Sequence, residues 1–238
     1  MLKSFAKQQL RRLGYTAGRY DAGLDPLAVR QSFFDRLELN VVFDVGANTG
    51  QYANMLRNHG YGGRIVSFEP MAVAFGALQN RARGDPRWTT LCCAVGDTAG
   101  ESTINVAGNS WSSSLLAMTP RHTQAAPASA FVQQERIRVV RLDDVFADHV
   151  RDGDRVYLKI DTQGYTAKVL DGAGSSLQRI VGLEVEMSLV PLYEGEPLIG
   201  EIITRLYAHG FTLALIKPEF TDRSSGQQLQ VDGIFVRQ

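Results

Sequence analysis

The sequence contains few of the residues that stabilise small secreted proteins. Its 238 residues include two cysteines, Cys92 and Cys93, which are adjacent. Adjacent cysteines rarely form a disulfide, because disulfide geometry requires well-separated Cα atoms. We therefore expect both to behave as small apolar residues in a strand, one on each face. This cysteine usage suits a reducing cytoplasm, which is the compartment we expect.

Long apolar runs and an excess of one charge sign are also missing. No stretch of about eighteen apolar residues occurs, so no transmembrane helix is expected. The N-terminus lacks the apolar core of a signal peptide. The 25 Lys and Arg residues balance 25 Asp and Glu residues. With zero net charge, the protein has no overall electrostatic field that would attract nucleic acid. Its length suits one α/β domain.

A short apolar run followed by a glycine loop, from Val41 to Gly50, is the most informative stretch that is present. Four apolar residues and Asp44 are typical of a buried parallel strand. Gly46 and Gly50 allow the backbone to approach a ligand, because glycine has no Cβ. A helix should begin near Thr49 or Gly50, with free N–H groups in its first turn. The stretch predicts the ligand-binding end of a doubly wound α/β sheet.

Asn48 and Asp44 indicate the kind of ligand. A dinucleotide-binding loop has glycine where this chain has Asn48, and Asp44 would repel a diphosphate. A carboxylate attracts a ligand that carries an ammonium and a sulfonium, such as S-adenosylmethionine (SAM). The pattern D-x-G-x-N-x-G resembles motif I of class I SAM-dependent methyltransferases. Asp44, Gly46, Asn48 and Gly50 are therefore predicted to bind SAM, although D-x-G alone also suits an ordinary strand and turn.

Short strands alternate with helices along most of the chain. Strands are predicted at 41–45, 64–69, 88–95, 102–106, 136–142, 155–161, 180–187, 211–216 and 232–237. Helices are predicted at 2–13, 25–38, 50–59, 71–83, 165–179 and 197–209, and Gly172 and Gly174 are candidate break points in the 165–179 helix. We expect residues 1–38 to form helices packed on a single domain, residues 39–238. Residues 108–130, rich in Ser, Ala and Pro, break the alternation and are predicted to form a lid.

Carboxylates close several predicted strands, at the sheet edge where open α/β folds bind ligands. Glu69 ends the second strand and can accept hydrogen bonds from both ribose hydroxyls. Asp97 follows the third strand and is predicted to face the adenine amino group, unless it is only a turn residue. Asp161 and the pair Glu184 and Glu186 close later strands on the acceptor side.

Seven short sequence motifs, in this order, resemble those of the FkbM family of methyltransferases over about residues 39–237. They are Phe68-Glu69-Pro70, Ala94-Val95-Gly96-Asp97, Leu142-Asp143-Asp144, Leu158-Lys159-Ile160-Asp161, Gln163-Gly164-Tyr165, Leu192-Tyr193-Glu194-Gly195 and Asp232-Gly233-Ile234-Phe235-Val236. The resemblance implies a Rossmann-like class I methyltransferase fold. That fold has a mostly parallel seven-stranded sheet, helices on both faces and an antiparallel terminal strand. It also implies SAM as cofactor and hydroxyls of sugars or macrolide-type products as acceptors. Thr166 stands where the family usually has glutamate, so a role of that glutamate does not transfer.

Methyl transfer to a hydroxyl needs alignment and a base. Asp161 is the first candidate base, and a helix cap or cofactor contact is the alternative. Glu186, at the adjacent strand end, could share Mg²⁺ with Asp161, although two carboxylates are a weak metal signature. His122 in the predicted lid is a further candidate base, but an exposed bystander is the favoured interpretation.

Four residues are predicted to contact the acceptor. Trp111 can stack on sugar C–H groups, while Ser113 and its neighbouring serines bond to hydroxyls. A flexible polar loop is the alternative for that segment. Tyr193 and Glu194 follow the 180–187 strand and could line the acceptor side of the pocket.

The sequence thus predicts a SAM-dependent O-methyltransferase that acts on a sugar hydroxyl in a glycan or glycolipid. O-methylation of a polyketide or another small secondary metabolite is the second interpretation. The third is a non-catalytic Rossmann-like module that binds a nucleotide. A small-molecule or glycan partner is expected in the first two cases, and no nucleic acid.

Overall fold

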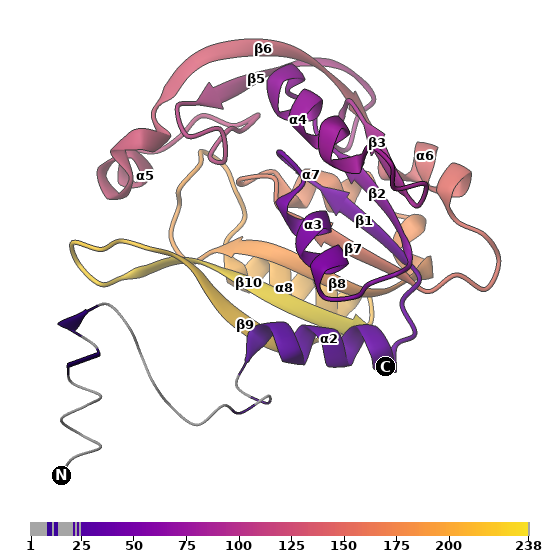
Figure 1. Cartoon of the computed structure of the whole chain (residues 1–238). Coiled ribbons are helices and arrows are strands. Elements are labelled where there is room, and N and C mark those ends of the chain that lie inside the picture. The colour runs from indigo at the N-terminus through magenta and orange to yellow at the C-terminus, as the bar shows by residue number, and fades with distance from the viewer. Residues whose placement is uncertain (1–8, 11, 14–20, 22, 24, 238) are drawn as a thin grey trace.

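The computed structural model describes residues 9, 10, 12, 13, 21, 23 and 25–237. The helix predicted at 2–13 lies largely outside the described residues. From residue 26 onward, helices and strands alternate as the sequence predicts (Figure 1). The helices are α2 (Pro26–Arg36), α3 (Gln51–Asn58), α4 (Ala72–Ala82), α5 (Pro120–Ala125), α6 (Leu142–His149), α7 (Thr166–Asp171) and α8 (Ile199–Ala208), with short 3₁₀ turns at Pro127–Ser129 and Ser176–Arg179.

Seven strands form the main sheet, in the order β3-β2-β1-β7-β8-β10-β9. They are β1 (Val41–Val45), β2 (Arg64–Phe68), β3 (Trp88–Leu91), β7 (Val156–Ile160), β8 (Ile180–Ser188), β9 (Phe211–Thr221) and β10 (Gln228–Arg237). Neighbours from β3 to β8 pair in parallel, whereas β10 runs antiparallel to both β8 and β9. This confirms the Rossmann-like class I methyltransferase fold, including one antiparallel strand from the end of the chain.

Helices cover both faces of this sheet because alternate residues of each strand point to opposite sides. Val41, Phe43 and Val45 of β1 pack in a cluster with α6, α7 and α8. Val42 packs in the opposite cluster, with α2, α3 and α4. Asp44 shares the face of Val42, so a carboxylate is buried beneath α2 and α3.

A second, three-stranded sheet lies above one end of the main sheet in Figure 1. It consists of β4 (Ala94–Val95), β5 (Gly100–Ala107) and β6 (Phe131–Val140), in the order β4-β6-β5. The single strand predicted at 88–95 is therefore wrong, because the chain passes from one sheet to the other at Cys92 and Cys93. Cys92 is exposed and Cys93 is buried, and neither belongs to a strand.

Two predicted elements have ends that contacts in the structure explain. The helix predicted at 165–179 ends at Asp171, which confirms the break at Gly172, where a Cβ would lie 1.9 Å from the carbonyl oxygen of Gly96. The strands predicted at 211–216 and 232–237 are longer, because β9 continues to Thr221 and β10 begins at Gln228, and together they form one long hairpin. Asp222 closes it by accepting bonds from the backbone N–H of Ser224 and the hydroxyl of Ser225.

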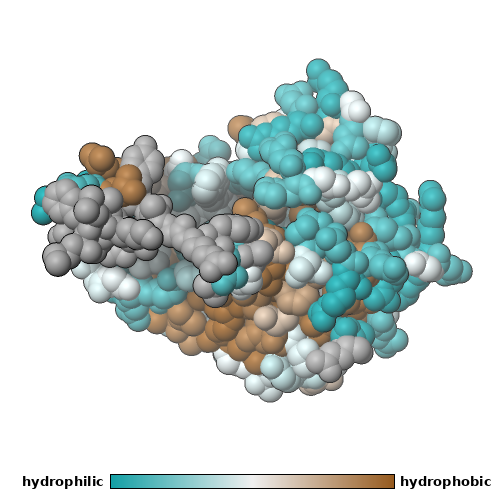
Figure 2. All heavy atoms as spheres, turned by 60° about the horizontal axis from the view of Figure 1, so that its bottom comes forward, coloured by the Kyte–Doolittle hydropathy of each residue, from teal (hydrophilic) through white to brown (hydrophobic). Residues whose placement is uncertain are grey.

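The face that carries α2 and β9 is turned forward in Figure 2, where hydrophobic residues gather in a band among polar ones. Leu27 of α2 and Ile216 of β9 are among the exposed large hydrophobic side chains. None of the helices in the described part of the chain has the length and hydropathy that a membrane crossing needs.

Candidate active site

The loop after β1 is shaped by close packing against the end of β7. Gly46 has φ +82°, and a Cβ there would lie 1.8 Å from the carbonyl oxygen of Asp161. Gly50 has φ +88°, and its Cβ would lie 2.9 Å from Leu78. Asn48 is left-handed without being glycine, and its Oδ1 accepts a bond from the backbone N–H of Thr49. The two glycines therefore serve protein packing, and α3 begins at Gln51 with Gly50 as its cap.

Glu69 joins this loop to the next one. Its Oε2 accepts the backbone N–H of Asn48 at 2.8 Å, and its Oε1 accepts that of Met71 at 2.8 Å. Burial raises the pKa of Glu69 to about 7, although the two backbone hydrogen bonds favour the ionised form. A carboxylate has about four lone-pair sites, so two remain for a ligand.

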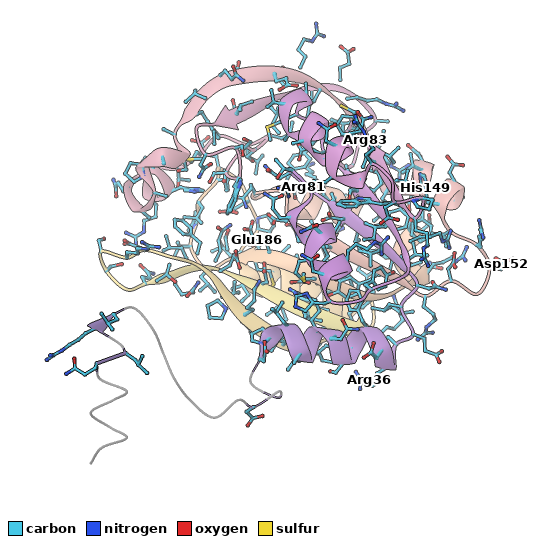
Figure 3. The ribbon with its side chains drawn as sticks, in the orientation of Figure 1. Arg36, Arg81, Arg83, His149, Asp152 and Glu186 are labelled. Atoms are coloured by element: carbon cyan, nitrogen blue, oxygen red, sulfur yellow. The ribbon has the colours of Figure 1, made fainter. Side chains whose placement is uncertain are left out.

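A cavity of about 620 Å³ opens beside these two loops, at the carboxyl ends of β1, β2 and β7. Small-molecule sites usually enclose about 300–1,000 Å³. The cavity continues from Gly46 and Glu69 past Asp161 to β8, β9 and β10. Figure 3 places Glu186 near the centre of the molecule, whereas Arg36 and Asp152 lie at its periphery. The order of the sheet reverses between β1 and β7, which is where such folds bind ligands.

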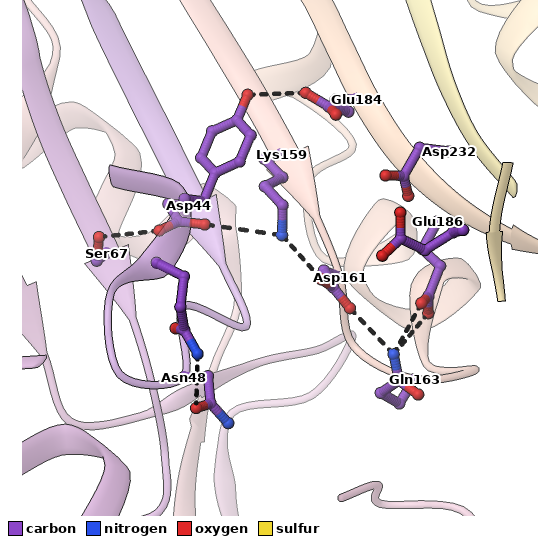
Figure 4. Close-up of polar contacts among 12 residues, drawn as sticks. Asp44, Asn48, Ser67, Lys159, Asp161, Gln163, Glu184, Glu186 and Asp232 are labelled. Atoms are coloured by element: carbon purple, nitrogen blue, oxygen red, sulfur yellow. Dashed lines mark hydrogen bonds and ion pairs between the residues drawn. The ribbon is translucent and has the colours of Figure 1, made fainter. Parts of the chain in front are cut away.

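Asp44 is not among the residues that line the cavity. Figure 4 shows its carboxylate between Ser67 and Lys159. Its Oδ2 accepts a bond from the Ser67 hydroxyl at 3.2 Å. Its Oδ1 has no hydrogen-bond partner and lies 4.0 Å from Nζ of Lys159. Burial raises the pKa of Asp44 to about 6, while Lys159 acts in the opposite direction. Any effect of Asp44 on a ligand must therefore pass through Lys159 or the loop.

Lys159 stands between the buried Asp44 and the cavity. Its Nζ lies 3.0 Å from Oδ2 of Asp161 and 5.1 Å from the centre of the Tyr52 ring. Burial would lower the pKa of Lys159, but Asp161 and Asp44 raise it above its ordinary value. The cation therefore stays charged and holds Asp161 in place.

Asp161 and Glu186 lie at one point of the cavity, as the strand ends predict. Both accept hydrogen bonds from the side-chain amide of Gln163, Asp161 at 3.1 Å and Glu186 at 2.8 and 2.9 Å. Burial alone would raise the pKa of Asp161, but Lys159 and the hydrogen bonds hold it below its ordinary value. Burial raises the pKa of Glu186 well above its ordinary value, and Asp161 and Asp232 add to this shift. Their surroundings thus give these two chemically similar carboxyl groups different pKa values.

The amide of Gln163 occupies the position predicted for Mg²⁺ between these carboxylates. Within the described residues, no three His, Cys, Asp or Glu side chains are grouped as metal ligands. The arrangement therefore gives no support to a magnesium site between Asp161 and Glu186.

Helix α2 supplies a charged group that the sequence does not reveal. Nε of Arg30 lies 2.9 Å from Oε2 of Glu184, and its NH2 group pairs with the other oxygen. The Tyr52 hydroxyl donates to the same carboxylate at 2.8 Å. Arg30, Tyr52 and Glu184 all line the cavity, next to Lys217 and Asp232 from the terminal hairpin. Nζ of Lys217 lies 2.8 Å from Asp232.

His122 is buried, so the interpretation as an exposed bystander is wrong. Only 2% of it is accessible, and its Nδ1 has no hydrogen-bond partner. Its ring packs against Tyr193 and Phe220, with centroids 5.2 and 5.4 Å apart. Burial lowers its pKa to about 4, so the imidazole is neutral at pH 7. His122 also lines the cavity, which keeps it a candidate proton acceptor.

The segment 108–130 covers the cavity, but its serines serve the loop itself. Ser113 Oγ donates to the carbonyl of Ser110 at 2.7 Å, and Ser114 Oγ donates to that of Gln163 at 2.6 Å. Both hydroxyls are therefore occupied, which argues against the predicted sugar contact of Ser113. Trp111 is 68% exposed and lines the cavity, as a stacking residue requires. The segment also contains α5 and is not wholly irregular.

Three other predicted residues lie outside the cavity lining. Asp97 pairs with Lys168 at 2.7 Å in a half-exposed ion pair. Glu194 is exposed to solvent. Tyr193 is fully buried behind the wall and donates from its hydroxyl toward Gln163. Thr166 is buried as the first residue of α7.

The cavity suits a ligand with the chemistry of SAM. Its carboxylates, Glu69 and Asp161, can accept hydrogen bonds from hydroxyl and ammonium groups, and their negative charge favours a cation. Backbone groups from Gly46 to Asn48 line the same end. These residues would hold the cofactor, and Asp44 would support them from outside the cavity lining.

Comparisons with known proteins agree with this geometry. A family model described as the methyltransferase FkbM domain matches residues 44–213. The chain is similar to 31-O-demethyl-FK506 methyltransferase FkbM from Streptomyces tacrolimicus, with 26% identity over 235 residues, 84% of this chain and 86% of that protein.

Solved structures with a similar chain path include two methyltransferases. An rRNA methylase from Streptococcus thermophilus has 10% identity and a TM-score of 0.48, over 90% of this chain and 97% of that one. The glycopeptide N-methyltransferase MtfA, complexed with sinefungin, has 12% identity and a TM-score of 0.43, over 94% and 90%. The family model covers more than half of the sequence. The chain therefore belongs to the FkbM family of methyltransferases and is a SAM-dependent enzyme of that family.

Proposed function

We propose that the protein transfers the methyl group of SAM to a hydroxyl of a sugar in a glycan or glycolipid. The supporting observation is the carboxylate-rich acceptor side of the cavity, formed by Asp161, Glu186 and Asp232. Carboxylate oxygens accept hydrogen bonds, and sugar hydroxyls donate them. The exposed Trp111 ring at the cavity provides a flat apolar surface for sugar C–H groups.

The cofactor in this proposal lies against the loop from Gly46 to Asn48. Glu69 accepts hydrogen bonds from the ribose hydroxyls with the lone pairs that its backbone bonds leave free. When bound, SAM supplies a methyl group on a positively charged sulfur. The nearby ionised Asp161 stabilises that charge and orients the acceptor hydroxyl.

Glu186 is a better proton acceptor in this site than Asp161. A low pKa keeps Asp161 ionised but makes it a weak base. The raised pKa of Glu186 brings its proton affinity nearer to the value that a base needs to accept a proton from the acceptor hydroxyl. As the oxygen–methyl bond forms and the methyl–sulfur bond breaks, the hydroxyl proton passes to Glu186. The sequence names Asp161 as the first candidate base, and this proposal gives that role to Glu186 instead.

A hydroxyl of a polyketide or another secondary metabolite is the second candidate acceptor. The observation that favours it is the relative from Streptomyces tacrolimicus, which is named for transfer to 31-O-demethyl-FK506. That name also supports oxygen as the methylated atom. The identity of 26% leaves room for a different acceptor pocket in this chain.

The test is a methyl-transfer assay with isotopically labelled SAM and two acceptor panels, one of sugars and glycolipids and one of hydroxylated polyketides. We expect a product heavier by one methyl group from the sugar panel, with the label on oxygen by NMR. Product from the polyketide panel alone would establish the second candidate. No SAM binding by calorimetry would reject both and support the nucleotide-binding module. Heat-denatured protein is the control.

A further inference from the structure

We propose that Gln163 is a positioning residue that sets the proton affinity of the Asp161–Glu186 pair, and that Tyr193 fixes the direction of its amide. This inference rests on the proposed function for its catalytic meaning. The contacts themselves exist in the free protein, so they can be tested without an acceptor.

Gln163 is held by its backbone at the point where the two carboxylates meet. It follows β7 with φ +51°, a left-handed conformation that a non-glycine residue adopts only when its surroundings demand it. Ser114 Oγ donates to its carbonyl at 2.6 Å. Its Nε2 carries two N–H bonds and faces both Asp161 and Glu186 within 3.1 Å. One amide group therefore serves two carboxylates.

Tyr193 determines which end of the amide points toward those carboxylates. Its hydroxyl lies 2.8 Å from Oε1 of Gln163 and 3.0 Å from the carbonyl oxygen of Ser112. A phenol has one proton, so it donates to one of these oxygens at a time. Donation to Oε1 directs Nε2 toward Glu186. The ring itself is buried and edge-on to His122, so it cannot turn away.

The opposite amide direction is disfavoured. It would place Oε1 of Gln163 against oxygens of both Asp161 and Glu186, and the ionised Asp161 repels it whatever the protonation state of Glu186. The hydrogen bond from Tyr193 and the two carboxylates therefore select the same amide direction.

Other charged groups around Glu186 act on the same equilibrium. Asp161 and Asp232 oppose its ionisation, and Lys159 favours it. Lys217 of β9 is paired with Asp232 and partly offsets that carboxylate. The amide of Gln163 stabilises the charged form, because hydrogen bonds to a carboxylate favour ionisation. Loss of the amide should therefore raise the pH at which Glu186 loses its proton.

The test is a carboxyl-carbon NMR titration of free protein labelled with ¹³C-glutamate, with the Glu186 signal assigned from Glu186→Gln. In Gln163→Met, we expect the Glu186 midpoint to move up by about one pH unit, a tenfold change in proton affinity. Tyr193→Phe keeps the ring and should move the midpoint in the same direction by a smaller amount. Ser114→Ala is the matched control, because it removes a bond to the Gln163 backbone and leaves the amide in place.

An unchanged midpoint in folded Gln163→Met would overturn the proposal, and an equal shift in Ser114→Ala would reduce Gln163 to a structural role. If Gln163→Met does not fold, Tyr193→Phe decides, because an unmoved midpoint there contradicts the proposal. The titration needs no acceptor, so it is independent of the acceptor assay. A shifted midpoint together with normal turnover in Glu186→Gln would retain the positioning role and reject Glu186 as the base.

Discussion

Asp161 and Glu186 share one hydrogen-bond donor yet differ in basicity because of what surrounds them. Lys159 lies 3.0 Å from Asp161, whereas Glu186 faces Asp161 and Asp232. Pairs of carboxylates whose pKa values are pushed apart are typical of sites that divide charge stabilisation from proton transfer. The division of roles follows from residues at β7, β8 and β10.

Removal of either carboxylate charge should therefore have a different kinetic effect. Glu186→Gln should lower the single-turnover rate of methyl transfer by roughly 10²-fold or more at saturating SAM, the scale of lost base catalysis. Asp161→Asn should weaken SAM binding as well as slow transfer, because the ionised group faces the cofactor end. Rapid-quench assays with calorimetry separate the two effects. A Glu186→Gln enzyme with normal turnover would move the search for a base to His122.

Glu69 should make a direct contribution to cofactor affinity. Glu69→Ala removes a carboxylate that lines the cavity and should weaken SAM binding by about 1–3 kcal/mol, the usual contribution of a hydrogen bond to a charged group. Asp97→Ala is the matched comparison, since Asp97 pairs with Lys168 outside the cavity lining. Calorimetry should show unchanged affinity in that variant. Equal losses would restore Asp97 to the adenine site.

Individual residues of the candidate site could be predicted from the sequence where they lie at the end of a strand. Glu69, Asp161 and Glu186 stand at such ends, and the sheet brings them to one cavity. Arg30 could not be predicted, because its partner Glu184 is 154 residues away in sequence. Lys159 did carry a signal, since a cation inside an otherwise apolar strand requires buried partners.

Helix α2 is attached to the core by a buried ion pair as well as by apolar contacts. Phe34 packs on Tyr157 with ring centroids 4.8 Å apart. Arg30 and Glu184 have side-chain exposures of 6% and 3%. Burial would raise the pKa of Glu184, but Arg30 lowers it below its ordinary value. The helix thus forms part of the cavity wall and supplies its charge.

Breaking this pair on one side should destabilise the fold strongly. Arg30→Met leaves the Glu184 charge buried and should lower the free energy of unfolding by about 3–5 kcal/mol. A lowered pKa contributes stability above the ordinary glutamate range and loses it as pH falls, so the difference should shrink in acid. Urea denaturation from pH 7 to pH 2.5 measures both effects, because the loss occurs below the ordinary glutamate range.

The double variant Arg30→Met with Glu184→Gln should recover much of the loss, because no lone charge then remains buried. Arg136→Met is the surface control. Its partner Glu101 is 73% exposed, and such pairs contribute about 0–1 kcal/mol. A cost for Arg30→Met as small as that of the control would show that α2 is held by apolar packing alone.

The segment 108–130 is fastened to the rest of the domain near its middle, and its first turn, residues 108–113, is hydrogen-bonded mainly within itself. Thr119 donates its backbone N–H to Leu192, and Glu194 donates to Ala117, both at 2.8 Å. The turn around Trp111 projects its ring into solvent. The predicted lid is therefore a covering loop whose mobility stays a prediction.

Hydrogen exchange should locate any such mobility. We expect slow exchange at Thr119 and Glu194 in the free protein, since their amides bond to distant parts of the chain, and faster exchange at residues 110–113, whose amides bond only within the turn itself. S-adenosylhomocysteine should slow exchange in the turn. Limited proteolysis is the second readout, with the first cut expected in 108–130. Uniform protection without a ligand effect would contradict a lid.

The sequence predicted most of the helices and strands, but the exact ends of several of them depend on contacts that the sequence does not reveal. Alternation of apolar runs and helices predicted the order of the main sheet's elements, because parallel units repeat a short pattern. The divided strand at Cys92 depends on pairing of Ala94 and Val95 with β6, about 45 residues later. The helix break at Gly172 was a candidate from the sequence, whereas the close approach of the Gly96 backbone at that position was not.

At the scale of the whole molecule, the net charge is zero, but the cavity contains more carboxyl groups than cations. The cavity gathers carboxylates from β2, β7, β8 and β10, and its cations Arg30, Lys159 and Lys217 are each paired with one of them. A ligand that enters therefore meets acceptors of hydrogen bonds and negative charge. This favours a sulfonium and opposes a phosphate, independently of any surface field.

The ligand preference of the folded protein should reflect this charge distribution. SAM at one hundred times its dissociation constant should stabilise the protein by about 2.7 kcal/mol and raise the melting temperature by roughly 5–10 °C. NAD and ATP at the same concentration should have little effect, since Glu69 and Asp161 repel phosphates and Asn48 replaces the glycine of a dinucleotide loop. Thermal unfolding with each ligand, and with S-adenosylhomocysteine as a sulfonium-free control, measures the difference. Stabilisation by NAD or ATP equal to that by SAM would mean that the carboxylates do not select the ligand, and would favour a nucleotide-binding role for the same cavity.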